Sequence, residues 1–148
     1  MPIHVDWYLL HHVIRERVWG HATQEDLNQH FDACKQMLAE AYTLSPQNKV
    51  HLLVDARDAE SLTPLYLAVD RGSQILQFKN RGTLFLVTRN RAVRTVVELT
   101  ARIGGTHFPL RVFNEHEAAL EALTSYLAQD TLRATQGRTA TKPADSDL

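Results

Sequence analysis

The fold of this chain is decided by the stretch Lys49-Val-His-Leu-Leu-Val-Asp-Ala-Arg-Asp58. Its apolar run from Val50 to Val54 predicts a buried β-strand, and ionisable side chains follow that run at once. The residues that come next, Ser61-Leu-Thr-Pro64, predict the start of a helix, with Thr63 as its N-cap and Pro64 in its first turn. In α/β proteins, ligands and partners gather where the carboxyl end of a strand meets the next helix. The stretch therefore predicts both a fold class and the position of a site.

Strands and helices alternate on both sides of this central strand. A hairpin and an amphipathic helix are expected before it, because apolar residues first alternate with charged ones and then recur at spacings of 4 and 3. Thr23 is placed to cap that helix, with Asp26 three residues further on. The predicted elements are strands at Trp7 to Leu10 and Val13 to Trp19, a helix with Leu27 to Ala41 on its core face, the strand Val50 to Val54, a helix from Pro64 to Leu76, a strand at Leu84 to Val87, a helix at Ala92 to Ile103, a strand at Leu110 to Phe113 and a helix with Leu120, Leu123 and Leu127 inward.

This order predicts an α/β fold with a mainly parallel central sheet of about 4–5 strands and helices packed on it. One domain over residues 1–129 accommodates all of these elements. Residues 130–148 are rich in Thr, Ala, Pro, Asp and Ser, and we expect them to form a disordered polar tail. A Rossmann fold is disfavoured because no glycine-rich turn follows the first strand, and no phosphate-binding P-loop motif is present.

Composition excludes several classes of protein. The formal net charge is -1, so no overall basic field attracts nucleic acid or an anionic membrane. A single cysteine rules out an internal disulfide and suits a reducing compartment, so a cytoplasmic location is expected. We expect no secretory signal, because the N-terminus lacks a basic region followed by an apolar run, and no membrane insertion, because no stretch approaches the about 20 apolar residues that span a bilayer.

Two stretches carry a resemblance to a known family. Val18-Trp-Gly-His-Ala-Thr-Gln-Glu-Asp-Leu27 is similar to the strand, glycine and capped first helix of STAS domains, and Val50-His-Leu-Leu-Val-Asp-Ala-Arg-Asp58 is similar to their central strand. Over residues 5–128 the chain resembles a STAS domain, the fold of anti-sigma-factor antagonists, and in particular the SpoIIAA-like branch. The resemblance implies a non-enzymatic regulatory or protein-interaction module.

In phosphoregulated STAS domains, an Asp-Ser or Asp-Thr pair opens the helix after the central strand. A partner kinase phosphorylates that hydroxyl, which adds about -1.5 to -2 of charge and breaks the partner interface. The matching stretch here is Ala59-Glu-Ser-Leu-Thr-Pro64, which lacks both the pair and the expected glycine. Ser61 and Thr63 are candidate phosphoswitches, and helix capping is the simpler interpretation of both hydroxyls. The resemblance implies a kinase or regulator as partner, and we expect a homodimer or other homo-oligomer that forms through an exposed apolar strand or helix.

Two charged clusters are candidate contacts for a ligand or partner. They consist of Asp55, Arg57 and Asp58 after the central strand, and of Arg89, Arg91 and Arg94 after the strand Leu84 to Val87. The first cluster can orient a polar ligand or form an ion pair that closes the loop. The second can bind an anion or an acidic surface near a helix N-terminus, or be a solvated basic loop. The alternative function is therefore a small-ligand or anion-binding protein, or an enzyme, that uses the cleft at the strand carboxyl ends. A purely structural dimer subunit is a third possibility.

The eight histidines show no pair at the spacing of the H-E-x-x-H zinc motif. His11 and His12 would point to opposite faces if they lay on a strand. Cys34 falls on the apolar face of the first helix and is interpreted as a small buried hydrophobe. We therefore predict no metal site, no cofactor and no catalytic residue.

Overall fold

The computed structural model describes residues 2–62, 64–103 and 109–140 of the chain. In these ranges, strands and helices alternate after an N-terminal hairpin. The elements are, in chain order, β1 (Ile3–Leu9), β2 (Val13–Ala22), α1 (Gln24–Leu44), β3 (Val50–Leu62), α2 (Leu65–Ile75), β4 (Arg81–Val87), α3 (Arg91–Ile103), β5 (Leu110–Phe113) and α4 (His116–Ala140). No helix within the described ranges is long and apolar enough to cross a lipid bilayer.

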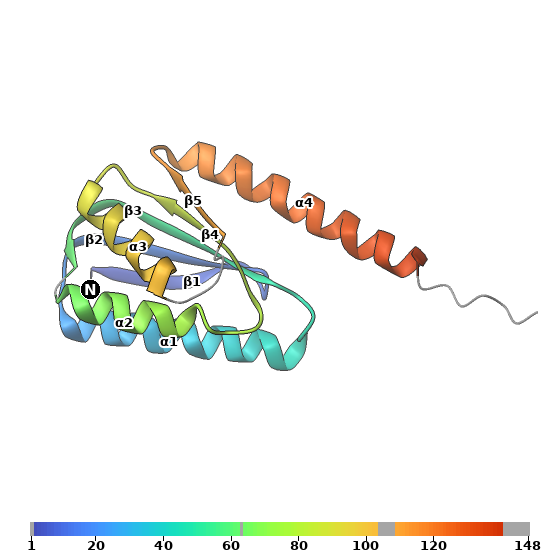
Figure 1. The fold of residues 1–148 in the computed structure, drawn as a ribbon, viewed down its shortest axis with the longest axis horizontal. Helices are drawn as coiled ribbons and strands as arrows, with labels where there is room; N and C mark the ends of the chain where they lie inside the picture. Colours follow the sequence, from blue (N-terminus) through green and yellow to red (C-terminus); the bar gives the residue numbers. More distant parts are fainter. Residues whose placement is uncertain (1, 63, 104–108, 141–148) are drawn as a thin grey trace, which may run out of the picture.

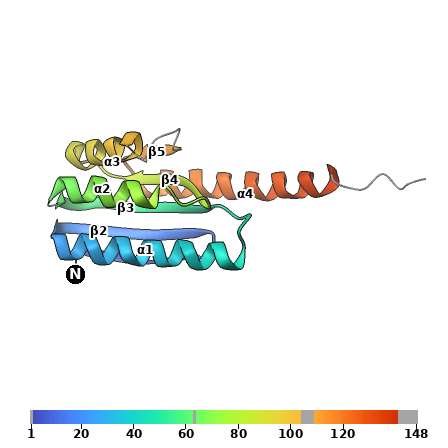
Figure 2. The same ribbon diagram turned by 60° about the horizontal axis from the view of Figure 1, so that its bottom comes forward.

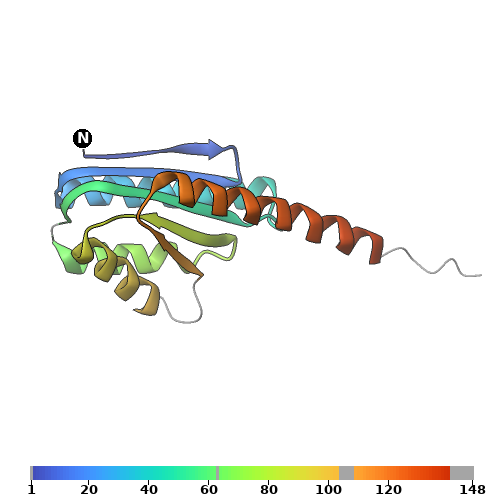
Figure 3. The ribbon, with the colours of Figure 1, turned by 90° about the horizontal axis from the view of Figure 1, so that it is seen from above.

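The five strands form one sheet in the order β1-β2-β3-β4-β5. β1 runs antiparallel to β2, whereas the β2–β3, β3–β4 and β4–β5 pairs are parallel. Helices α1, α2 and α3 cover one face of the sheet (Figures 1 and 2), and α4 lies across the opposite face (Figure 3). The predicted α/β class, the mainly parallel sheet and the N-terminal hairpin are confirmed.

Each face of the sheet has its own apolar core, because successive residues of a strand point to opposite faces. Leu52 and Leu84 pack under α1 and α2, while their neighbours Leu53 and Phe85 pack under α4. Both cores are apolar, so the sequence of these strands shows an unbroken apolar run. That pattern is expected of parallel strands covered on both faces.

The N-terminus of α1 is capped as its sequence predicts. The Thr23 side chain accepts a hydrogen bond from the Asp26 backbone N–H, and the Asp26 carboxylate accepts one from the Thr23 backbone N–H at 2.9 Å. These two bonds satisfy backbone donors that have no partner inside the helix. The hydrogen bonds from Thr23 also hold the pKa of the Asp26 carboxyl below its usual value.

β3 is longer than predicted, and it contains the charged cluster instead of ending before it. The strand continues through Leu62 and stays paired with β2, with register shifts between Arg17 and Trp19 and between Gly20 and His21. Ala59 remains in the core between these two irregularities, while Arg57 and Asp58 are exposed and Asp55 is buried. The prediction failed because a strand with one uncovered face tolerates charge at alternate positions.

The start of α2 also differs from the prediction. Pro64 occupies the N-cap position with an extended backbone, at φ -81° and ψ 145°, and the helix begins at Leu65. Thr63, which was predicted to be the cap, lies outside the described residues. Ser61 belongs to β3 and does not cap the helix, so the capping interpretation of its hydroxyl is wrong.

Helix α4 runs to Ala140, well past its predicted end at Gln129. The expected disorder is therefore wrong for residues 130–140, while residues 141–148 lie outside the described ranges. Two polar side chains fit this helix because their hydroxyls donate to carbonyls four residues earlier, Thr131 to Leu127 and Thr135 to Thr131, both at 3.0 Å.

The His51 side chain on β3 contacts both β4 and Asp130 in the extended part of α4. Its buried ring accepts the Thr83 backbone N–H at Nδ1, at 3.0 Å, and its Nε2 lies 2.8 Å from the Asp130 carboxylate. Because Nδ1 accepts from a backbone donor, the ring proton is on Nε2 and is donated to Asp130. Gly82 makes room for the ring, since a Cβ at that position would lie 2.4 Å from Nδ1.

We predict that Gly82→Ala lowers the free energy of unfolding by about 1–3 kcal/mol, because the added methyl group pushes the His51 ring out of its place. Urea denaturation measures the change. In a His51→Ala background the same substitution is expected to cost little, because the obstructing ring is gone. An equal loss in both backgrounds would show that the ring is not what the methyl group meets.

Candidate functional site

Asp55 and Arg57 are held together as a two-pronged ion pair. Arg57 Nε donates to Asp55 Oδ1 at 2.9 Å and Nη2 donates to Oδ2 at 2.8 Å, while the Arg57 backbone N–H adds a third bond at 3.3 Å. The hydrogen bonds from Arg57 are the main reason that the pKa of the Asp55 carboxyl is below its usual value. The donors and acceptors that could meet a ligand are thus largely used within the pair.

Asp58 and the three predicted arginines do not join this pair. Asp58 is exposed on β3, and no hydrogen bond or ion pair described here links it to Asp55 or Arg57. Arg89 binds the Glu115 carboxylate and the Asn114 carbonyl at the start of α4, while Arg94 pairs with Glu98 within α3 at 2.8 Å. Arg91 is exposed at the first turn of α3. With two of its three guanidinium groups bound to acidic side chains, this set does not form an anion pocket.

The hydroxyl of Ser61 lies at the far carboxyl end of β3, beside a histidine from β2. His21 Nδ1 is 2.7 Å from Ser61 Oγ, and its Nε2 is 2.8 Å from a Glu60 carboxylate oxygen. Glu60 and Ser61 are neighbours in sequence, and both reach the ring because the pairing of β2 with β3 shifts register beside His21. The side chains of His21 and Glu60 are 71% and 65% exposed, so water competes for every bond in the group. A nucleophile in such an open position lacks the dry environment that supports catalysis.

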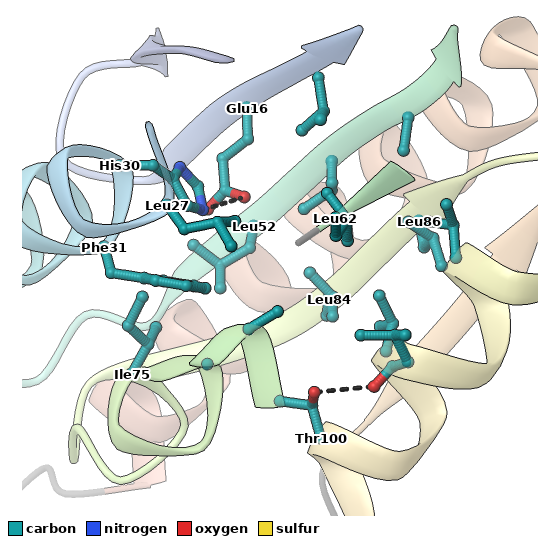
Figure 4. Close-up of a pocket in the computed structure, with 18 of the residues that line it drawn as sticks. Glu16, Leu27, His30, Phe31, Leu52, Leu62, Ile75, Leu84, Leu86 and Thr100 are labelled. Carbon is teal, nitrogen blue, oxygen red and sulfur yellow. Dashed lines mark hydrogen bonds and ion pairs between the residues drawn. The ribbon is translucent and has the colours of Figure 1, made fainter. Parts of the chain in front are cut away.

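A cavity of about 110 Å³ lies between the sheet and helices α1, α2 and α3 (Figure 4). Its wall is apolar apart from Glu16, His30 and Thr100, and the Thr100 hydroxyl is satisfied by the Val96 carbonyl at 2.7 Å. The apolar wall comes from every element that surrounds the cavity, and includes Leu27, Phe31, Leu52, Leu62, Ile75, Leu84 and Leu86. The cavity therefore lies within the main core and is partly open to the surface.

Glu16 and His30 line one end of this cavity, and Cys34 lies behind them in contact with Glu16. Glu16 extends from β2 toward α1, where His30 and Cys34 stand one helical turn apart. The His30 Nε2 atom lies 3.3 Å from Glu16 Oε2, and the Cys34 thiol donates to Glu16 Oε1 at 3.1 Å. Burial, and secondarily the Glu16 charge, raise the pKa of the Cys34 thiol well above its usual value. The thiol is thus a protonated donor in this arrangement.

Comparison with known proteins supports the fold alone. No family model matches the chain, and no curated protein is similar to it in sequence. A crystal structure of an uncharacterised DUF3478-family protein from Shewanella loihica, described as having a SpoIIAA-like fold, matches with a TM-score of 0.56 and 14% identity. The match covers 82% of this chain and 91% of that protein. This chain has a SpoIIAA-like fold. The resemblance inferred from Val18 to Leu27 and from Val50 to Asp58 is thereby confirmed at the level of fold.

Sequence reasoning missed the polar end of the cavity in this SpoIIAA-like domain. One signal was present in β2, where Ile14, Glu16 and Val18 alternate with Arg15 and Arg17. Period-2 alternation places the first three on the helix-covered face, so a carboxylate was due to be buried there. Buried carboxylates require partners, and the nearest reactive side chains on the first helix supply them.

The cavity lowers the stability of the SpoIIAA-like domain. At about 24 cal/mol per Å³, an enclosed empty cavity of about 110 Å³ would cost about 2.6 kcal/mol, which is an upper limit for a cavity that is partly open. Small residues at the surface of the cavity keep it open, among them Ala68 and Gly72 on α2. Gly72 also sets how closely α2 approaches α3, because a Cβ there would lie 2.8 Å from Thr100 Cγ2.

We predict that Ala68→Leu raises the free energy of unfolding by about 1 kcal/mol, because the larger side chain fills part of the cavity. The matched control is Ala41→Leu in α1, which is buried in the same core away from the cavity wall and is expected to cost about 1–3 kcal/mol by overpacking. Chemical denaturation of the two variants and the wild type measures both values. Destabilisation of similar size in both variants would show that the cavity has no room for the added atoms.

We predict that Asp55→Asn lowers the free energy of unfolding by about 1 kcal/mol near neutral pH, because the substitution removes the carboxylate charge that accepts both hydrogen bonds from the Arg57 guanidinium. The folded-state pKa of Asp55 is depressed, so its stabilisation is present above the unfolded pKa and is lost as pH falls through the folded value. Wild type and variant should therefore converge in stability at low pH. An unchanged difference between them across an acid titration followed by circular dichroism would contradict the ion pair.

Proposed function

We propose that this SpoIIAA-like domain is a non-enzymatic protein-interaction module whose partner surface lies at the carboxyl ends of β2 and β3. The observation that carries the proposal is the position of the Ser61 hydroxyl, which lies 2.7 Å from His21 on an exposed rim instead of serving as a helix cap. A hydroxyl in this position is accessible to a kinase. We therefore assign Ser61 as the residue whose phosphorylation controls the partner contact.

The surroundings of Ser61 have the composition of an interface. Trp19 on β2 is 38% exposed and carries the Arg17 guanidinium over its ring at 5.8 Å from the centroid. Tyr66, in the first turn of α2, is 72% exposed. Trp19 is paired with Asp58 toward the carboxyl end of β3, and α2, with Tyr66 in its first turn, begins at the same end of the sheet (Figure 1). Exposed Trp, Tyr and Arg side chains are the residue types that most often dominate protein interfaces.

Phosphorylation would make this rim more negative. A phosphate on Ser61 adds about -1.5 to -2 of charge at neutral pH. It would attract the His21 ring and repel the Glu60 carboxylate, so the present contact of His21 with Glu60 would be replaced. Because Glu60 is exposed, it can move away without unfolding the strand. The fold thus tolerates either state, and the surface presented to a partner differs between them.

We predict that Ser61 carries phosphate when the domain is incubated with ATP and an extract of its own cells, whereas Ser125, an exposed serine on α4, does not. Peptide mass spectrometry with the Ser61→Ala and Ser125→Ala variants measures this. A partner captured by the wild type should bind Ser61→Ala equally well and lose about tenfold or more in affinity for Ser61→Asp, since an interfacial charge that is left unpaired costs roughly 1.4 kcal/mol or more. Absence of phosphate on Ser61, together with equal partner binding by the wild type, Ser61→Ala and Ser61→Asp, would overturn the proposal.

A second candidate function is favoured by the cavity. An apolar space of about 110 Å³ is smaller than the about 150 Å³ engineered cavity that binds benzene, so it suits a very small apolar ligand. Such binding would be non-enzymatic and would use the helix-covered face of the sheet rather than the rim at Ser61. Xenon is a suitable probe, and a xenon-dependent rise in melting temperature that is lost in Ala68→Leu would support this function.

Self-association is also proposed, through the free edge of the sheet at β1. Among the described residues this strand pairs on one side only, with β2, and its last residues Tyr8 and Leu9, with the following Leu10, are 45%, 44% and 61% exposed. An unpaired edge flanked by exposed apolar side chains favours pairing with another chain. Light scattering during size exclusion measures the oligomeric state directly.

A further inference from the structure

We propose that Glu16, His30 and Cys34 bind one divalent transition-metal ion of the zinc class, with the fourth coordination position facing the cavity. Each of the three side chains offers one donor atom, and these atoms lie within 4.8 Å of one another. The proposal is independent of Ser61 and its surface, because it concerns the opposite side of β2.

The geometry of the three donors is close to that of a coordination shell. The Cys34 sulfur is 3.1 Å from Glu16 Oε1 and 4.0 Å from His30 Nδ1, and His30 Nε2 is 3.3 Å from Glu16 Oε2. Metal–ligand bonds of about 2.0–2.3 Å in a tetrahedral site place ligand atoms roughly 3.3–3.6 Å apart. These closest approaches involve both ring nitrogens of His30 and both oxygens of Glu16, whereas a single set of one atom from each side chain lies within 4.8 Å. Shifts of about 1 Å would bring that set to coordination distances.

All three donor residues lie on regular secondary structure, and none lies on a loop. His30 and Cys34 are four residues apart on the buried face of α1, and Glu16 faces them from β2, which is paired on both sides. The His30 ring also packs against Phe31, with 4.7 Å between ring centroids. Sites built on packed helices and strands hold their ligands in a defined geometry, as metal binding requires.

Charge is the second argument for an ion. The Glu16 carboxylate is only 6% exposed, and its partners in the described part of the chain are an imidazole and a thiol. A buried carboxylate is expensive unless a cation or several hydrogen bonds compensate it. A divalent ion bound to one carboxylate, one thiolate and one neutral imidazole forms a group with no net charge, which is well suited to an apolar core.

The chemistry of binding follows from the protonated state of Cys34. The metal ion displaces the thiol proton, which leaves to solvent, and a metal–sulfur bond replaces the S–H group with no change of oxidation state. A mixed set of sulfur, nitrogen and oxygen donors favours zinc or cobalt over magnesium or calcium. Three protein ligands leave a fourth position open, and the adjoining cavity has the volume for a water molecule or a small ligand there.

The test uses the full chain refolded with Co²⁺, freed of loosely held metal on a chelating resin and then analysed for metal content and absorption. We expect about one Co²⁺ per chain, a thiolate-to-cobalt charge-transfer band in the near ultraviolet, and displacement of that band by Zn²⁺. Cys34→Ser is expected to lose the band, and Glu16→Gln to lower the bound metal several-fold. His12→Gln removes an exposed histidine and is the matched control that should retain both signals.

Two results would overturn the proposal. A wild-type protein that refolds but shows no charge-transfer band would identify the cluster as a buried ion pair with a thiol donor. Equal loss of cobalt from His12→Gln and Cys34→Ser, without the band, would place the metal at a surface histidine. The wild-type spectrum decides the first case even if a core variant fails to fold, and circular dichroism of each variant reports on its fold.

Discussion

The parallel pairing of β2 with β3 is the constraint on which the rest of this structure depends. It places His21 beside Ser61 at one end of the two strands and sets Val13 beside His51 at the other. Between these ends the register shifts twice, and the shift between Arg17 and Trp19 lets both Ala56 and Ala59 stay in the core although they are three positions apart. Without the irregular pairing, regular alternation would have placed Ala56 and Ala59 on opposite faces.

Three helices cover one face of the sheet and a single helix, α4, covers part of the other. Each candidate site lies where this covering is incomplete. On the face of α1, α2 and α3, three helices meet over the central strands and leave a cavity where small residues line their junction. On the other face, α4 covers Leu53, Phe85 and Val87 and is fastened by His51, while Arg17 and Trp19 remain open to solvent. Core defects suit small ligands or ions, and open strand surfaces suit macromolecules.

The sequence predicted the elements that depend on local periodicity and missed those that depend on pairing. The hairpin, the cap at Thr23 and the order of strands and helices follow from spacing within about ten residues, and all of them are confirmed. The extension of β3 is paired with β2, and the first residue of the α4 extension, Asp130, contacts His51. Neither partner can be identified from the polar residues of the segment itself, so both segments were predicted to lie outside regular structure.

The candidate site illustrates the same division. Asp55 and Arg57 were recognised as a charged cluster, but only the structure shows that they are bound to each other by two parallel hydrogen bonds. The meeting of Glu16 with His30 and Cys34 joins a strand and a helix whose relative rotation no sequence pattern specifies. Alternation within β2 does specify that Glu16 faces inward, so the orientation of this one member of the three-residue cluster was accessible to sequence reasoning.

The alternation of β2 also determines how the two proposed activities relate. Glu16 points into the helix-covered core, whereas Arg17 and Trp19 point to the open face and lead toward His21. The metal ligands and the partner surface therefore lie on one strand but on opposite sides of the sheet, and no contact described between them joins the two groups. A substitution of Cys34 changes the core and leaves the rim at Ser61 intact, while a charge at Ser61 adds nothing to the cavity.

Because the strand itself is rigid and paired on both sides, coupling between the two sites would require a shift in the β2–β3 register. The irregular pairing beside His21 is where such a shift would meet the least resistance, since the ladder of hydrogen bonds is already interrupted there.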